Sequence, residues 1–194
     1  MHGLINKAIQ SFIRDTYGDE VWEAVRLAAD LPFPEFEAML IYEDALTDRV
    51  IDAAATRLGK TRATVLEDLG TYLVTHPNLE PLRRLFRFGG VTFVEFLHSL
   101  DDLRDRVRLA LPELEIPRLR LTVEAEGTYR VDIPDGPAGF GHVLEGIIRA
   151  MADDYGALAL LEHECAEDGA EWIRVHVVDT SHSEGREFSL AKTG

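Results

Sequence analysis

The chain has 194 residues, of which 46% are hydrophobic, enough for one domain or for two closely packed lobes around a core. Its 35 acidic residues outnumber 20 basic ones, and the formal net charge of −15 would repel nucleic acid or an anionic membrane surface. With only one cysteine, Cys165, no intrachain disulfide can form, which favours a reducing cytoplasm. The N-terminal segment is amphipathic and lacks the continuous apolar stretch of a signal peptide or membrane span.

The first part of the chain is predicted to be helical, because apolar residues recur at intervals of three and four. Ile5 lies on the apolar face of the first helix, and Asp19 is predicted to cap the second. A third helix is predicted near residues 45–58. Thr61 is predicted to cap a fourth, which stops before Pro77.

A short helix over residues 79–88 is predicted to end at a glycine pair, and the longest helix of the chain is predicted over about residues 92–111. After Pro117 the period changes from helical spacing to alternation, which predicts strands near 119–123 and 129–133 joined by a tight turn. Beyond them the pattern predicts a helix over 142–155.

Two further strands, near 158–164 and 171–179, are predicted to flank the turn at Asp168 and Gly169. Helices followed by an antiparallel sheet with one inserted helix make the predicted fold class α+β. We expect a single domain over residues 1–194, with a helical lobe over about 1–60, a helix-and-sheet lobe over about 61–185 and a tail over 186–194.

An arginine interrupts the apolar face of the predicted longest helix. At 100° per residue, Arg104 falls inside the arc that contains Leu97, Leu100 and Leu103. A cation that faces a core must be paired or must line a cavity. Two interpretations stay open: Arg104 pairs with Asp101 or with the backbone near Leu100 and extends to solvent, or its guanidinium holds an anionic group in an internal pocket.

The segments MHGLINKAIQSFIRDTYGDEVWEAV and FVEFLHSLDDLRDRVRLALPELEIPRLR resemble the opening and the haem-bearing helix of the haem-nitric oxide/oxygen binding (H-NOX) family. The resemblance covers nearly the whole chain. In that family a leucine-histidine pair on the long helix supplies the proximal iron ligand, and a proline follows the histidine at a fixed interval. Here the pair is Leu103-Arg104, and Pro117 lies 13 positions later, at the family's interval.

An arginine cannot ligate iron, because its guanidinium is protonated at every physiological pH and offers only donors. His98 lies six residues earlier, about 120° away on a helix, so it would replace the ligand only if the helix were rotated. A second family signature, a tyrosine-serine-arginine set that grips the haem propionates, is not present in the corresponding stretch YRVDIPDGPAGFGH. Of the residue types in this signature, that stretch contains only Tyr129 and Arg130.

The apolar walls of the family pocket are better preserved. Ile5 and Pro117 match positions that press on the porphyrin, and Val143 stands where oxygen-binding members place a tyrosine, which would favour nitric oxide over oxygen if haem were bound. The resemblance therefore implies haem b as cofactor, while Arg104 argues against it. The predicted pocket residues are Arg104, Ile5, Pro117, Leu100, Leu97, Val143 and Ile147.

No catalytic residues and no metal ligands are assigned. His163 and Cys165 lie two apart on a predicted strand and resemble part of a zinc site found in some family members, but two ligands do not complete such a site, so both are interpreted as surface residues. His176, on the polar face of the last strand, does not change this. Nucleophile, Walker and metalloprotease motifs are missing, so an enzyme is not expected.

Two functional hypotheses remain. The first is a cytoplasmic regulatory domain without ordinary histidine-ligated haem, which either holds an apolar anionic molecule in its pocket or works through protein contacts. By resemblance, its partner would be a separately encoded histidine kinase or cyclic-dinucleotide enzyme. The alternative is a haem-based nitric oxide sensor with a non-standard axial ligand.

Overall fold

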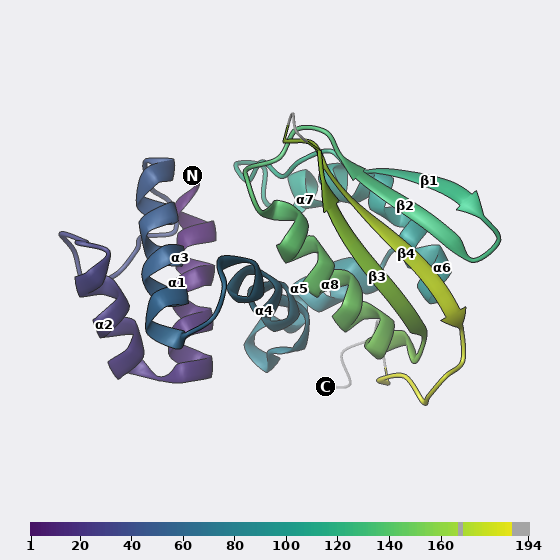
Figure 1. Cartoon of the computed structure of the whole chain (residues 1–194), viewed down its shortest axis with the longest axis horizontal. Helices are drawn as coiled ribbons and strands as arrows, with labels where there is room; N and C mark the ends of the chain where they lie inside the picture. Colours follow the sequence, from purple (N-terminus) through teal and green to yellow (C-terminus); the bar gives the residue numbers. More distant parts are fainter. Residues whose placement is uncertain (167–168, 188–194) are drawn as a thin grey trace. The chain divides into compact units, whose positions relative to one another are not determined.

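The computed structural model describes residues 1–166 and 169–187. It has the predicted α+β class, with helices first and an antiparallel sheet with one inserted helix after them. The chain divides into two compact units, unit 1 over Met1–Leu69 and unit 2 from Gly70 onward, so the division falls inside helix α4 (Arg62–Thr75). Figure 1 shows helices alone in unit 1 and helices together with the sheet in unit 2.

Unit 1 consists of α1 (Gly3–Tyr17), α2 (Asp19–Ala28), α3 (Asp44–Leu58) and the first turns of α4. Two buried polar side chains accept hydrogen bonds inside it. Asn6 Oδ1 accepts a hydrogen bond from the Thr47 hydroxyl at 2.7 Å, and Gln10 Oε1 accepts one from the Phe36 amide at 2.9 Å. The surrounding core is apolar and almost fully buried, and it includes Ile9, Phe12, Ile13, Trp22, Val25, Phe36, Val50 and Ile51.

The two predicted caps in unit 1 have different outcomes. Thr61 is confirmed, since its hydroxyl accepts a hydrogen bond from the Thr64 amide at 3.1 Å. The cap assigned to Asp19 is wrong, because Gly18 occupies the cap position and Asp19 is the first helical residue. The Asp19 carboxylate instead accepts a hydrogen bond from Arg14 Nε at 2.6 Å.

The single long helix predicted over residues 92–111 is wrong, because the segment is broken into three pieces. These are α6 (Phe93–His98), the 3₁₀ turn η2 (Ser99–Asp102) and α7 (Leu103–Ala110). The Ser99 hydroxyl donates to the Phe96 carbonyl at 2.7 Å, and Arg106 donates to the Ser99 carbonyl at 2.7 Å. Both bonds favour a tightened turn over regular α-helical bonding at this point.

Before this segment, unit 2 contains the 3₁₀ turn η1 (Pro77–Leu79) and the predicted short helix α5 (Glu80–Arg87). The sheet is formed by β1 (Arg120–Ala125), β2 (Thr128–Ile133), β3 (Leu158–Cys165) and β4 (Glu171–Asp179), in the order β1-β2-β4-β3 with every pair antiparallel. Helix α8 (Phe140–Tyr155), with 16 residues, is the longest described helix. Within the described ranges, no helix is both long and apolar enough to cross a membrane.

The first two residues of the predicted tail over 186–194 are hydrogen-bonded to unit 2. Arg186 donates its backbone N–H to the Asp154 carbonyl at 2.9 Å, and the Glu187 carbonyl accepts a bond from Arg83 at 3.4 Å. These two residues are therefore held on unit 2. Residues 188–194 of the predicted tail, and Asp168 of the predicted turn, lie outside the described residues.

Candidate functional site

Six of the seven predicted pocket residues lie in unit 2. They are Leu97 on α6, Leu100 in η2, Arg104 on α7, Pro117 in the connection to β1, and Val143 and Ile147 on α8. Ile5 lies on α1 of unit 1, where it is half-buried. Five of these six residues thus come from the helical segment around Arg104 and from the helix inserted in the sheet, and Pro117 comes from the connection before β1.

Three of these residues belong to the packed core of unit 2. Leu97 and Leu100 are fully buried, and Ile147 is 5% exposed. They form one hydrophobic cluster with sheet residues such as Val131 and Ile173, and Val143 packs partly buried against the same cluster. Core packing within unit 2 accounts for their burial without a ligand.

Gly70 holds the second half of α4 close to α8. A Cβ atom added at Gly70 would lie 2.0 Å from the Val143 carbonyl oxygen and 3.0 Å from the Ile147 amide nitrogen. Only a residue without a side chain allows two helix backbones to approach this closely. The contact fixes the stretch of α8 that carries two of the predicted pocket residues.

Arg104 stands at the edge of the buried face of α7. Its neighbours Leu103 and Val107 are 3% and 6% exposed and belong to the core, whereas Arg104 is half-buried. Its Nε atom is shielded from solvent, and its guanidinium makes no hydrogen bond or ion pair with any residue that the structure describes. The described residues include no pairing of Arg104 with Asp101, whose Oδ1 atom accepts a hydrogen bond from the Leu121 amide at 2.6 Å.

Arg106, two residues further along α7, shows the more usual arrangement. Its guanidinium donates to the Leu85 carbonyl at 3.3 Å, to the Ser99 carbonyl at 2.7 Å and to the Ser99 hydroxyl at 3.0 Å. Burial away from water lowers the pKa of Arg106. Arg106 thereby joins α5, η2 and α7, and Arg104 makes no equivalent link.

The residues at the expected iron position do not fit a histidine-ligated haem. Arg104 offers only N–H donors, and iron needs a lone pair. His98 is exposed, and its ring meets the ring of Tyr129 edge-on, with 5.7 Å between centroids, on the side of the segment that faces the sheet. The ring of His98 is thus packed against the sheet.

The residues expected to hold the haem propionates make contacts within the sheet instead. Tyr129 is 8% exposed in the core, whereas its neighbour Arg130 points to the opposite face of β2, as strand alternation requires. Arg130 Nε pairs with Asp132 at 2.7 Å, and the guanidinium lies 4.5 Å above the ring of Trp172. Arg130, Asp132 and Trp172 line an open cavity of about 410 Å³ at the end of the sheet.

A second group of polar side chains lies at the start of α8. Ligand atoms of His142, Glu145 and His163 all fall within 4.8 Å of one another, and the two histidine rings are 4.2 Å apart. Two imidazoles and a carboxylate are donors that zinc accepts. His142 and Glu145 were missed from the sequence, although their spacing of three on a helix could have signalled a shared face.

Glu171 connects this group to the backbone of α8. Its carboxylate accepts hydrogen bonds from the Gly139 amide at 2.9 Å, the Gly141 amide at 2.8 Å and His163 Nε2 at 2.9 Å. A carboxylate from β4 thus satisfies the first free N–H groups of the helix. The surface interpretation of His163 is wrong, since its side chain is only 10% exposed and is bonded to Glu171.

Cys165 takes no part in this group. It is exposed, and its Sγ atom lies 3.5 Å from the Ala166 carbonyl oxygen. His176 is exposed as well, with its Nδ1 atom 3.0 Å from the Thr128 hydroxyl. Of the two residues that resembled part of a zinc site, only His163 lies among the ligand-type side chains.

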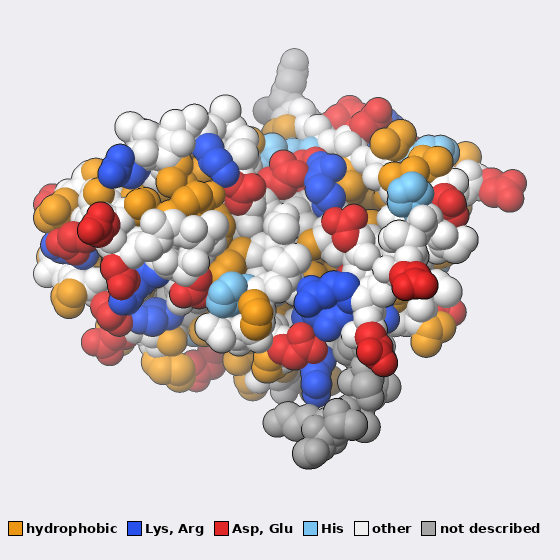
Figure 2. Space-filling model, turned by 90° about the horizontal axis from the view of Figure 1, so that it is seen from below, with side chains coloured by type: hydrophobic (Ala, Val, Ile, Leu, Met, Phe, Trp, Pro, Cys, Tyr) orange, Lys and Arg blue, Asp and Glu red, His pale blue; other side chains and the backbone are white. Residues whose placement is uncertain are grey.

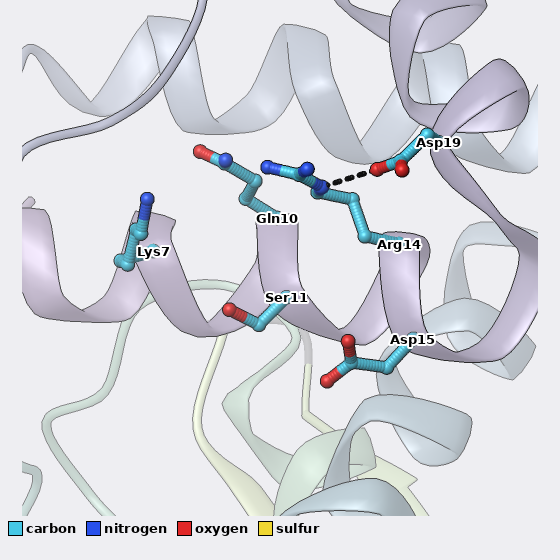
Figure 3. Close-up of a pocket in the computed structure, with 6 residues that line it drawn as sticks. All are labelled: Lys7, Gln10, Ser11, Arg14, Asp15 and Asp19. Carbon is cyan, nitrogen blue, oxygen red and sulfur yellow. Dashed lines mark hydrogen bonds and ion pairs between the residues drawn. The ribbon is translucent and has the colours of Figure 1, made fainter.

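Unit 1 contains a cavity of about 310 Å³ that is lined mainly by α1. Figure 3 shows Lys7, Gln10 and Arg14 on one side of the helix. Lys7 pairs with Glu35 at 2.8 Å, and Arg14 pairs with Asp19 at 2.6 Å and with Glu35 at 3.0 Å. The hydrogen bond to Asp19, and then that to Glu35, raises the pKa of Arg14. Both cations are already neutralised, so the cavity offers no excess positive charge.

The acidic excess of the chain is not gathered into one patch on the face shown in Figure 2. There, acidic side chains lie among basic, histidine and hydrophobic ones. On the outer face of the sheet, Arg174 is surrounded by the carboxylates of Glu124, Glu162 and Glu164, at 2.8, 3.3 and 3.1 Å. Charges are therefore paired locally, and this sheet face has no free cationic stripe.

A model of the haem-NO-binding family matches residues 2–163. Curated relatives include soluble guanylate cyclase gcy-31 of Caenorhabditis elegans, 24% identical over 79% of this chain and 22% of the relative. Soluble guanylate cyclase 89Db of Drosophila melanogaster is 23% identical over 81% of this chain and 24% of the relative. The chain thus spans about a quarter of the length of these relatives.

Solved structures with the same fold include an H-NOX protein from S. oneidensis in its Fe(II)NO ligation state. The TM-score is 0.77, with 12% identity over 92% of this chain and all of that one. The unliganded Fe(II) H-NOX protein from K. algicida gives a TM-score of 0.75, with 14% identity over 97% of this chain and all of that one. At these identities the likeness establishes the fold.

Proposed function

Because the chain belongs to the haem-NO-binding family, we propose that it is a regulatory sensor domain whose pocket holds an apolar anionic molecule at Arg104 in place of histidine-ligated haem. Members of this family bind haem and act with partner signalling domains. The chain has the fold of that sensor, and by resemblance of the sequence Arg104 takes the position of the iron-ligating histidine. The proposal therefore retains the signalling role and changes the ligand.

The observation that carries the proposal is the arginine without an acceptor. Arg104 is half-buried, its Nε atom is shielded from water, and no described residue accepts a hydrogen bond from it. A shielded donor without a partner costs about 1 to 3 kcal/mol, and more if it is charged. A carboxylate or phosphate could accept two parallel hydrogen bonds from the guanidinium and neutralise it.

The apolar part of the ligand follows from the neighbours of Arg104. Leu97, Leu100 and Val107 occupy the same helical segment, and all three are buried and apolar. Core packing already buries these side chains, so we propose that the segment opens to admit the ligand, whose hydrocarbon would then be buried against them. We therefore propose a lipid-like carboxylate, held at Arg104 by its head group, with Pro117, Val143 and Ile147 of unit 2 as further wall residues.

We also propose that the domain regulates a separate enzyme and has no catalytic activity itself. Its curated relatives are soluble guanylate cyclases, which are about four times longer. A cyclase, a histidine kinase or a cyclic-dinucleotide enzyme would fit as the partner, in the cytoplasm. The domain would report ligand binding through movement of the helical segment that carries Arg104.

Purified protein tests the proposal. The protein is expressed with ample haem supply, its visible spectrum is recorded, and bound molecules are identified by native mass spectrometry. We expect no haem band and a co-purifying acidic lipid that is lost in Arg104→Ala but kept in Arg108→Ala, a control on the exposed face of α7. Equimolar haem in the wild-type protein would overturn the proposal in favour of a nitric oxide sensor with another axial ligand.

A further inference from the structure

We propose that residues Ser183–Glu187 form a latch on unit 2 that loosens when the start of α6 moves. The inference rests on the proposed function only in treating the chain as a regulatory domain. The latch follows β4 and returns to the C-terminal end of α8. It would convert a change in the helical segment of Arg104 into a change in the accessibility of the chain beyond β4.

Backbone hydrogen bonds hold the latch. The Ser183 amide donates to the Gly156 carbonyl at 3.0 Å, and the Arg186 amide donates to the Asp154 carbonyl at 2.9 Å. The last carbonyls of a helix have no partners within the helix, so the latch satisfies groups that α8 leaves open. Every side chain of the latch is exposed. Little apolar burial therefore opposes its release.

A buried carboxylate lies under the latch. Asp154 is 1% exposed, and its Oδ1 atom receives Arg83 Nε at 2.9 Å and a second Arg83 nitrogen at 2.8 Å. The same guanidinium donates to the Glu187 carbonyl at 3.4 Å, and the Arg186 side chain lies 3.9 Å from Asp154 Oδ1. One charged pair thus fixes α5, α8 and the latch together.

Two glycines make the fit possible. A Cβ atom at Gly156 would lie 2.2 Å from the Ser183 carbonyl oxygen, and one at Gly185 would lie 2.8 Å from the Asp154 carbonyl oxygen. Gly156 also has a φ of +73°, whereas Gly185 does not have a left-handed backbone. Alanine at position 185 would therefore be unstrained in a free chain and would clash only in the docked latch.

Tyr155 connects the latch to the start of α6. It is the residue after Asp154, and its hydroxyl donates to the Gly90 carbonyl at 2.8 Å. Its ring lies 6.3 Å from that of Phe93 and 6.0 Å from that of Phe96. Displacement of the first turn of α6 therefore acts directly on the end of α8 to which the latch is bound. The same segment continues through η2 into α7 and Arg104.

Hydrogen exchange of the full chain tests whether the latch is docked. We expect the Ser183 and Arg186 amides to be protected in the wild type. In Gly185→Ala their exchange should rise about fivefold or more, corresponding to the loss of one or two backbone bonds. Glu184→Ala is the control, because Glu184 lies in the latch with an exposed side chain. Unprotected amides in the wild type, or equal exchange in both variants, would overturn the latch.

Tyr155→Phe tests the connection to α6, because it removes only the hydroxyl that reaches Gly90. We expect faster exchange at Ser183 and Arg186 while the amides of β2 and β4 keep their protection, which excludes global loosening. Unchanged exchange in the latch would refute the connection. Neither experiment needs a ligand, so failure of the proposed function at Arg104 would leave the result for the latch intact.

Discussion

Two arginines shielded on neighbouring helices of unit 2 are in opposite situations. Arg83 on α5 is 5% exposed and is fully engaged by Asp154, by Glu80 at 3.3 Å and by the Glu187 carbonyl. Arg104 on α7 is half-buried, and no described residue pairs with it. Burial alone therefore does not determine whether an arginine is structural or free to bind a ligand. The presence or absence of an internal acceptor separates the structural cation from the one available to a ligand.

The largest expected effect is the difference in the free energy of unfolding between Arg83→Ala and Arg104→Ala. Arg83→Ala removes the main partner of a buried carboxylate and should lower the free energy of unfolding by about 3 kcal/mol or more. Arg104→Ala removes a shielded donor without a partner, so it should leave the free energy of unfolding unchanged or raise it by about 1 to 3 kcal/mol. Urea denaturation followed by circular dichroism measures both. Equal losses would mean that Arg104 has a structural partner after all.

The carboxylate of Glu171 extends the comparison to a buried acid with several partners. Glu171→Ala removes the acceptor of two backbone amides of α8 and of His163, and we expect a loss of about 2 kcal/mol in unfolding free energy. Glu164→Ala, on the outer face of the sheet and 46% exposed, is the matched control and should lose less than about 0.5 kcal/mol. Similar losses in both variants would refute the capping role of Glu171.

The smallest expected effect concerns the pH dependence of stability. Burial raises the pKa of Tyr155 above its usual value near 10, and the nearby Arg87 opposes this in part. The folded state then retains the proton longer than the unfolded state, so stability is complete below about pH 10 and falls as the pH rises above that. Tyr155→Phe should show a shallower fall between pH 9 and about 11. A parallel pH dependence in both proteins would contradict this assignment.

Sequence patterns predicted the element order well, because apolar periodicity depends on local spacing alone. These patterns could not predict the break in the helix at Ser99. Phe96, Leu100, Leu103 and Val107 keep helical spacing across it, and the break depends on bonds from the Ser99 hydroxyl and from Arg106. Similarly, Asp19 looked like a helix cap because the pattern could not show that Gly18 already ends one helix and begins the next.

Only part of the candidate site could be predicted from the sequence. Arg104 was identified because a cation within an apolar arc conflicts with local patterning. The group formed by His142, Glu145 and His163 was not, since it depends on the packing of α8 against β3, which brings together residues about 20 positions apart. Arg83 and Asp154, 71 positions apart, were missed for the same reason.

The central claim is that an arginine stands where iron should be held. The most direct measurement is a haem titration of the purified wild-type protein beside Arg104→His, followed by visible absorption. We predict weak, non-stoichiometric uptake by the wild type, and tighter uptake with the spectrum of histidine-ligated iron in the variant. Tight equimolar binding by the wild type, with a histidine-ligated spectrum that Arg104→His leaves unchanged, would contradict the account.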